Sequence, residues 1–261
     1  MAQAEAINAV LLSGGQRLWS GRRRRVQKYL EERGIGFDVG ITKVPLVSQS
    51  CLFDLGWAAV MCAPTGPWPT GPARMQAMMP PRKATWARAP AAPWANTRGM
   101  ERAMKSGFGT YALQAGHLKV GALVAVNALG DIYEGETQIA GLLNPEKTAL
   151  SNTLEELFGD VTIADNLFTG NTTLGIVFTN AKLNKTQLTK VAGMTHNGFA
   201  RAIRPVHTNA DGDSIYALST GDLPGDVNVV GAMAAWAMER AIVRAVKAAR
   251  PSYGLPAWDT L

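Results

Sequence analysis

Three short stretches of the sequence carry side chains that can take part in acyl transfer. Asn171-Thr172-Thr173 precedes an apolar run, and a threonine hydroxyl can attack an amide carbonyl when a nearby base accepts its proton. Asp211 and Asp213 are separated by one glycine, so in an extended segment both carboxylates point to one face. Asn127 follows an apolar run, and its side-chain amide suits an oxyanion donor. By themselves, the first two patterns are more typical of a polar loop and a surface turn, and Asn127 is equally compatible with a cap at a strand end.

The elements that must position these groups follow an α/β pattern. Apolar runs predict strands over residues 7–12, 44–55, 120–126, 214–218 and, after a polar loop, within 169–179. Helical spacing of apolar residues predicts helices over residues 25–33, 150–158, 185–203 and 227–248. The last helix carries a broad apolar stripe of Val230, Ala234, Ala237, Met238, Ala241, Ile242 and Ala245. Because regular units of a doubly wound parallel sheet are missing, we predict a layered α/β fold with helices packed on sheets.

The positive charge of the chain is concentrated in two segments. Residues 16–25 and 57–98 hold ten of the 26 basic residues and no acidic residue, and they also hold eight of the 14 prolines. Without these segments the charge of +6 becomes −4. A nucleic-acid binder that uses Arg22 to Arg25 is disfavoured, because no aromatic-interleaved motif accompanies the basic run.

The same two segments have no helical or strand periodicity, and a loop as long as residues 57–98 is improbable inside a compact chain. Codons can be written for residues 16–25 that give SAFGLAAADG in a shifted frame with one base restored. Codons for residues 85–96 can likewise give VGAGTGGTVGK, and those for residues 59–65 can give GDVRPD. We therefore hypothesise two compensated frameshifts, in the gene or in its sequencing. The alternative is a genuine basic, proline-rich insertion, and sequencing the DNA across these codons decides between them.

Several classes of protein are disfavoured by composition. No apolar run reaches the length of about 20 residues that a membrane helix needs, and no signal peptide is recognisable, so we expect a cytoplasmic protein. Cys51 and Cys62 cannot form a disulfide framework. His117, His196 and His207 are not at metal-ligand spacing, so we predict neither a metal nor a cofactor and assign no role to these histidines.

Five stretches together resemble a known enzyme family. They are EERGIGF at residues 31–37, VGALVAVNALGD at 120–131, NTTL at 171–174, ARAIRPVHT at 200–208 and DGD at 211–213. Their combination is similar to the DmpA-type aminopeptidases (L-aminopeptidase/D-esterase), which are related to β-aminopeptidases and to nylon-oligomer (6-aminohexanoate-oligomer) endohydrolases. The two strings obtained by frame repair also resemble glycine-rich motifs of this family. The resemblance covers most of residues 1–56 and 99–261, and each stretch alone is unspecific.

The resemblance implies an αββα sandwich of the N-terminal-nucleophile type, shared with the ornithine acetyltransferases, in a single peptidase domain over residues 1–261. A precursor of this family cuts itself before a Ser or Thr, here between Asn171 and Thr172, into parts 1–171 and 172–261. The new α-amine, with a reference pKa of about 8, can then serve the nucleophile Thr172 as its base. The resemblance assigns the tuning of Thr172 to Asp211 and Asp213 and oxyanion donation to Asn127. Residues 104–109 resemble a helix-to-glycine turn of the family framework.

The implied function is amide hydrolysis on small substrates: peptides with a free N-terminus, β- or D-amino acid amides, or short polyamides. Homo-oligomers of cleaved pairs are expected, and neither a nucleic-acid partner nor a membrane is. Two alternatives remain open: an acyltransferase of the ornithine acetyltransferase type and a catalytically inactive remnant. The family begins several dozen residues earlier, so N-terminal strands are expected to be missing, and a lysine on the glycine-rich strand emerges at residues 95–96 only after frame repair. The Asn171–Thr172 bond is therefore predicted to stay largely intact in the chain as written and to be cut in a frame-repaired version.

Overall fold

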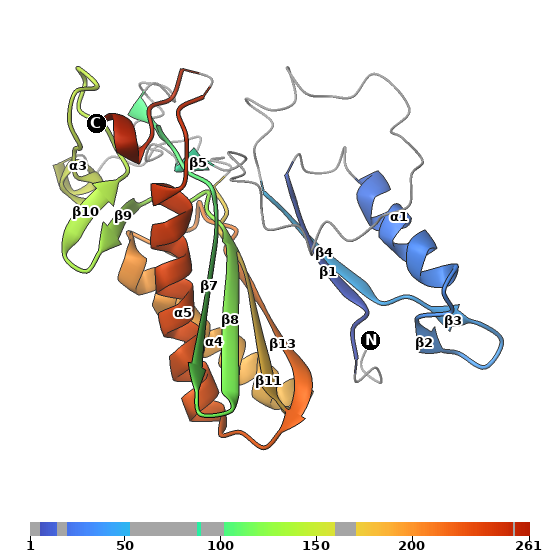
Figure 1. Ribbon diagram of the computed structural model, residues 1–261. Coiled ribbons are helices and arrows are strands. Elements are labelled where there is room, and N and C mark those ends of the chain that lie inside the picture. Colours follow the sequence, from blue (N-terminus) through green and yellow to red (C-terminus); the bar gives the residue numbers. More distant parts are fainter. Residues whose placement is uncertain (1–5, 15–19, 53–87, 90–101, 160–170, 253) are drawn as a thin grey trace. The chain divides into compact units, whose positions relative to one another are not determined.

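The computed structural model describes residues 6–14, 20–52, 88–89, 102–159, 171–252 and 254–261 (Figure 1). The chain divides into two compact units, Met1–Arg82 and Lys83–Leu261. Trp19, Trp57, Trp68, Trp86 and Trp94 lie outside the described residues, as does most of the segment 57–98. The prediction that these tryptophans join no common core therefore stays a prediction, as does the single domain.

The first unit is a small α/β element. Strands β1 (Ala9–Gly14) and β4 (Val47–Leu52) pair in parallel, and helix α1 (Ser20–Glu31) connects their ends with the short hairpin of β2 (Phe37–Asp38) and β3 (Lys43–Val44). The helix begins five residues earlier than predicted, because the basic run at residues 22–25 is itself helical. Gly34 follows it with φ +62°, a conformation that glycine adopts without steric cost.

The second unit is built on a four-stranded mixed sheet in the order β13, β11, β8, β7. Its strands are β7 (Phe108–Ala115), β8 (Leu118–Ala125), β11 (Leu174–Ala181) and β13 (Ser214–Leu223). β11 pairs antiparallel with β8 and in parallel with β13, so the start of β11 lies beside the end of β8 and the start of β13. This arrangement places the residues just before β11 between two neighbouring chain segments.

Two long helices pack against each other and against this sheet (Figure 1). They are α4 (Lys185–Ala202) and α5 (Val227–Lys247), and each begins at a capped residue: Asn184 accepts from the backbone of Gln187, and Asp226 accepts from the backbone of Asn228 and Val229. The predicted apolar stripe of α5 is completely buried, and it forms one core with apolar residues of β8 and α4 such as Val124 and Phe199.

Shorter elements surround this core. β10 (Thr137–Ala140), β9 (Asp131–Glu134) and β12 (Ile203–Arg204) form a three-stranded antiparallel sheet. β5 (Arg88–Ala89) pairs with β6 (Met104–Lys105), and the remaining elements are α3 (Thr153–Gly159) and the 3-10 turn η4 (Trp258–Thr260). Asp131 joins this region to α3, because its buried carboxylate accepts from the backbone of Leu142 and from the backbone and hydroxyl of Thr153.

The α/β class and the packing of helices on a sheet are confirmed, as are the strand within 120–126 and the two long helices. The helix-to-glycine turn predicted over residues 104–109 is wrong: these residues form β6 and the start of β7. Gly109 is needed there because a Cβ would lie 1.9 Å from the carbonyl oxygen of Ala241 in α5. β13 continues five residues beyond its predicted end, since the hydroxyl of Thr220 bonds to the carbonyl of Thr179 in β11. Among the described residues, no helix is long and apolar enough to cross a membrane.

Candidate active site

Thr172 lies one residue beyond the N-terminal end of β11, where the sheet pairing extends past the regular strands. Asn171 forms a parallel bridge with Asp211, and the Gly212 N–H donates to the Asn171 carbonyl oxygen at 3.0 Å. On the other side, the Thr172 N–H donates to the carbonyl oxygen of Asn127 at 2.7 Å. Both polar groups of the Asn171–Thr172 peptide bond are therefore held, each by a different segment. Thr172 itself is buried.

The hydroxyl of Thr172 donates a short hydrogen bond to the carbonyl oxygen of Asn171. That oxygen therefore accepts from two donors, a side-chain hydroxyl and the Gly212 N–H. Gly212 also sets the space around the hydroxyl, because a Cβ at this position would lie 2.9 Å from Thr172 Oγ1. The Asp-Gly-Asp segment thus packs directly on Thr172 through its glycine.

Asp213 lies close to Thr172 through the next residue. Its Oδ1 accepts from the Thr173 N–H at 2.7 Å, and its Oδ2 lies 2.9 Å from Nδ1 of His207. The Asp213 side chain is only 5% exposed, and this burial raises its pKa to about 6. The hydrogen bond from Thr173 opposes the rise in pKa, and the negative charge of Asp211 adds to it.

Asp211 is adjacent to the site, but its carboxylate serves a turn. Its Oδ2 accepts from the backbone N–H of Thr208 at 3.0 Å and from the Thr208 hydroxyl at 2.7 Å. The backbone of Asp211 pairs with Asn171. The structure therefore brings Asp211 to the cleavage peptide through its main chain, and the carboxylate fixes the loop that carries Gly212 and Asp213.

Asn127 also reaches the site through its main chain. It follows β8 and is buried, and its carbonyl oxygen accepts the Thr172 N–H. Four sequence-predicted positions, Asn127, Thr172, Asp211 and Asp213, are thus gathered at one end of the four-stranded sheet. Their catalytic roles stay predictions.

Two histidines that the sequence analysis left without a role extend this cluster. Nε2 of His207 lies 3.2 Å from Nδ1 of His196, so His196, His207 and Asp213 form a continuous chain of contacts. Burial lowers the pKa of His196, and the nearby His207 lowers it further. Spacing gave no signal for this contact, because His207 adopts the left-handed conformation at φ +58° inside an irregular loop.

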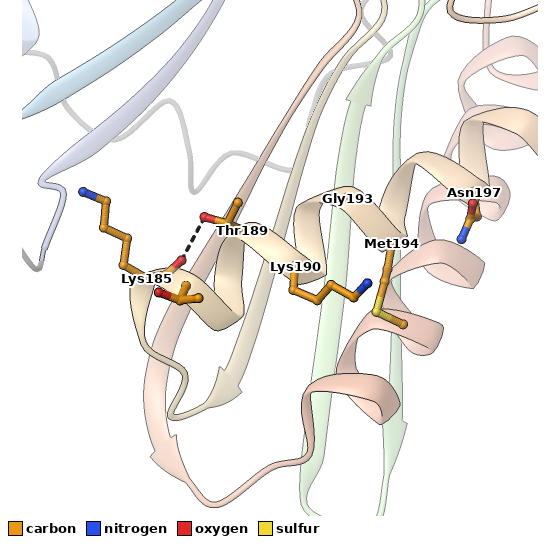
Figure 2. A pocket seen from close by; sticks show the side chains of 7 residues that line it. Lys185, Thr189, Lys190, Gly193, Met194 and Asn197 are labelled. Atoms are coloured by element: carbon orange, nitrogen blue, oxygen red, sulfur yellow. Dashed lines mark hydrogen bonds between the residues drawn. The ribbon is translucent and has the colours of Figure 1, made fainter. Parts of the chain in front are cut away.

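A cavity of about 710 Å³ lies elsewhere, along the outer side of α4 (Figure 2). It is lined by Lys185, Thr186, Thr189, Lys190, Gly193, Met194 and Asn197, and the Thr189 hydroxyl donates to the Lys185 carbonyl within it. The cavity shares no residue with the Thr172 site. Over the described parts of the chain, no three His, Cys, Asp or Glu side chains are close enough to hold a metal ion.

The sequence model of peptidase family S58 matches residues 95–256, which is more than half of the chain. The chain belongs to peptidase family S58. The family resemblance predicted from the sequence is thereby confirmed, and so is the enzyme class of a hydrolase that acts on amide bonds. The four predicted site positions all lie within the matched S58 region.

Relatives of known or inferred activity agree with this membership. An uncharacterised aminopeptidase of Mycobacterium leprae is 32% identical over 275 residues, which cover 97% of this chain and 75% of that protein. A 6-aminohexanoate-oligomer endohydrolase of Kocuria sp. is 24% identical over 277 residues, covering 92% of this chain and 72% of that protein. A solved structure, the L-aminopeptidase D-Ala-esterase/amidase of Ochrobactrum anthropi, has a TM-score of 0.40 and 20% identity. That match covers 56% of this chain and 41%, less than half, of the solved chain.

Proposed function

We propose that this S58 chain is a self-processing amidohydrolase whose nucleophile is Thr172. The observation that supports the proposal best is the Asn171–Thr172 peptide bond. Its carbonyl oxygen is held by Gly212, its N–H is held by Asn127, and the Thr172 hydroxyl rests against the same carbonyl. A hydroxyl fixed this close to a carbonyl group replaces a bimolecular encounter by an intramolecular one.

In the proposed self-cleavage, Oγ1 of Thr172 attacks the carbonyl carbon of Asn171 as the hydroxyl proton leaves. The negative charge that develops on the Asn171 oxygen is stabilised by the Gly212 N–H. The C–N bond then breaks while the Thr172 nitrogen takes up a proton, which leaves an ester between Asn171 and the Thr172 oxygen. Water hydrolyses this ester, and the products are a carboxylate at Asn171 and a free amine at Thr172.

In the proposed turnover, the free amine of Thr172 accepts the hydroxyl proton as the oxygen attacks a substrate amide. An amine product leaves, and water then releases the acyl group. The Asn127 carbonyl keeps the Thr172 nitrogen in place, and the Asn127 side-chain amide is the predicted second oxyanion donor. Asp213 fixes the adjacent Thr173 peptide through its N–H, whereas Asp211 acts through the loop that it stabilises.

The relatives indicate the class of substrate. One is named for aminopeptidase activity and another for the hydrolysis of 6-aminohexanoate oligomers. Both names describe short amides, so we propose small peptides or short polyamides as substrates. Because the two reactions differ only in what surrounds the scissile bond, self-cleavage is the sharper first test.

Intact-mass spectrometry tests the nucleophile directly, with the chain as written and the frame-repaired version in parallel. The frame-repaired version is expected to yield residues 172–261 as a fragment that begins with Thr, and Thr172→Ala is expected to abolish this fragment. Thr173→Ala is the matched control, because the buried Thr173 hydroxyl has no hydrogen-bond partner among the described residues, so its loss breaks no bond there. A frame-repaired chain that never splits would remove Thr172 from its role and favour the inactive remnant.

A further inference from the structure

We propose that His207 is a positioning residue for Thr172: it holds the Asp213 carboxylate, which in turn holds the peptide that follows the nucleophile. His196 supports His207 from α4. This inference rests on the proposed function, since it concerns the same nucleophile. Neither histidine touches the Thr172 hydroxyl in the hydrogen bonds of the described residues, so each acts through another group.

The geometry forms an unbroken series of contacts. The Thr173 N–H donates to Oδ1 of Asp213 at 2.7 Å, and Oδ2 of the same carboxylate lies 2.9 Å from Nδ1 of His207. Nε2 of His207 lies 3.2 Å from Nδ1 of His196. A ring nitrogen that donates to a carboxylate fixes the tautomer and the orientation of the imidazole, and His207 does the same for Asp213 in return.

The surroundings hold both rings in place. Phe199 packs on the two histidines, with its centroid 5.4 Å from the His196 ring and 5.9 Å from the His207 ring, the latter pair being stacked. His207 also has φ +58°, which is uncommon for a residue other than glycine, asparagine or aspartate. A bulky side chain that stays in this conformation is held there by its contacts, and here these are Asp213, His196 and Phe199.

Physical chemistry gives this contact a purpose. A buried carboxylate is costly unless donors satisfy both of its oxygens, and Asp213 is almost fully buried. Without His207, Oδ2 would lose the donor beside it, and the carboxylate would turn towards water or take up a proton. Either change weakens its hold on the Thr173 N–H, and through this peptide it shifts Thr172. A shift of about 1 Å in a reacting group can slow a reaction about a hundredfold.

The charged neighbours determine how the effect depends on pH. Asp211 faces Asp213 and disfavours its ionised form, whereas His207 favours it, and His196 is the titratable group beside His207. Because the pKa of Asp213 is about 6, the carboxylate accepts fully only above this pH. Loss of the His207 cation is therefore expected to raise the pKa of Asp213 further and to move the acidic limb of self-cleavage to higher pH.

The test uses His207→Ala, His207→Asn and a matched control, His117→Asn. Asparagine tolerates the left-handed conformation and keeps one N–H donor, so the variant separates the hydrogen bond and the backbone from the charge. His117 lies in the exposed turn between β7 and β8, where its carbonyl accepts from Asn180. Melting temperatures show which variants fold, and the asparagine variant keeps the test valid if the alanine variant does not.

Two readouts separate this inference from the proposed function. The first is the pH titration of the Thr173 amide by NMR in the uncleaved chain, which needs no activity. Its midpoint is expected to rise by about one pH unit in His207→Ala and in His207→Asn, and to stay unchanged in His117→Asn. The second is the self-cleavage rate, which is expected to fall at least about tenfold at pH 6–7 in His207→Ala and to recover near pH 8 in His207→Asn.

An unchanged amide titration in both His207 variants would overturn the inference, whatever the chain does to its own backbone. A shifted titration combined with a chain that never cleaves would support the contact and refute the proposed function instead. A loss of cleavage in His207→Asn that is equal at every pH, without a shift of the amide titration, would mean that His207 only packs and would also overturn the inference.

Discussion

Gly212→Ala tests the packing of the Asp-Gly-Asp segment on the nucleophile. The new Cβ would lie 2.9 Å from Oγ1 and 3.6 Å from Cγ2 of Thr172. A carbon and an oxygen at ordinary contact are about 3.5 Å apart, so the hydroxyl must retreat by roughly 0.5 Å. Because the threonine side chain is short, that retreat requires a rotation of χ1 by roughly 20°, which costs on the order of 1 kcal/mol or less.

The expected result is a stable protein that cuts itself slowly. The Gly212→Ala variant is expected to unfold within about 1 kcal/mol of the parent chain. Self-cleavage, by contrast, depends on the placement of Oγ1 against the Asn171 carbonyl, and a displacement of about half an ångström is expected to slow it roughly tenfold or more. The assay is the rate at which the fragment 172–261 accumulates, followed by intact mass in the frame-repaired version beside the chain as written.

Gly193→Ala is the matched control for this substitution. Gly193 lies within α4, where a Cβ would meet nothing within 4 Å. Alanine in a helix is favoured over glycine by about 1 kcal/mol, so this variant is expected to be more stable and to cleave at the parental rate. If Gly212→Ala folds normally and cleaves as fast as Gly193→Ala, the glycine does not restrain the nucleophile and the reasoning fails.

Two further predictions concern the framework. Asp226→Ala removes the side chain that accepts from the N–H groups of Asn228 and Val229 at the start of α5, and a loss of about 1 kcal/mol is expected in denaturant unfolding. Burial raises the pKa of Asp131 from 3.8 to about 6, so the folded state binds more protons than the unfolded state between these pH values. Stability therefore falls as pH rises through this window. Against Asp131→Asn, the parent chain is expected to lose up to about 3 kcal/mol between pH 4 and pH 7, and a pH-independent difference would contradict this.

Helical periodicity was sufficient for the elements that form the core. The apolar stripe of α5 is buried as predicted, because a helix of this length with one wide apolar face has to cover it. The start of α4 follows from Asn184 and Gln187, which form a reciprocal cap. β7 was not predicted, because Gly109 and the partly exposed residues that follow hide its alternation, and its place depends on pairing with β8.

For the site, the sequence indicated which residues matter but not how they contribute. Thr172 and the Asp-Gly-Asp segment are about 40 residues apart, and only the parallel pairing of β11 with β13 brings them together. Residue types suggested that side chains of Asn127 and Asp211 act on Thr172, whereas their contacts to the Asn171–Thr172 segment include backbone groups. Backbone hydrogen bonds at strand ends depend on register, which no side-chain pattern specifies at single-residue precision.

The use of backbone groups links the two proposed reactions. The Asn171–Thr172 peptide is held as if it were one more residue pair of the sheet, with Gly212 on its carbonyl and Asn127 on its N–H. When the bond breaks, neither of these partners belongs to the departing segment, so both stay in place. The Asn127 carbonyl can keep the new amine where the amide was, and the Gly212 N–H is left facing the position of a departed carbonyl. A substrate carbonyl that enters this position meets the same donor, so the arrangement that would drive self-cleavage would also serve turnover.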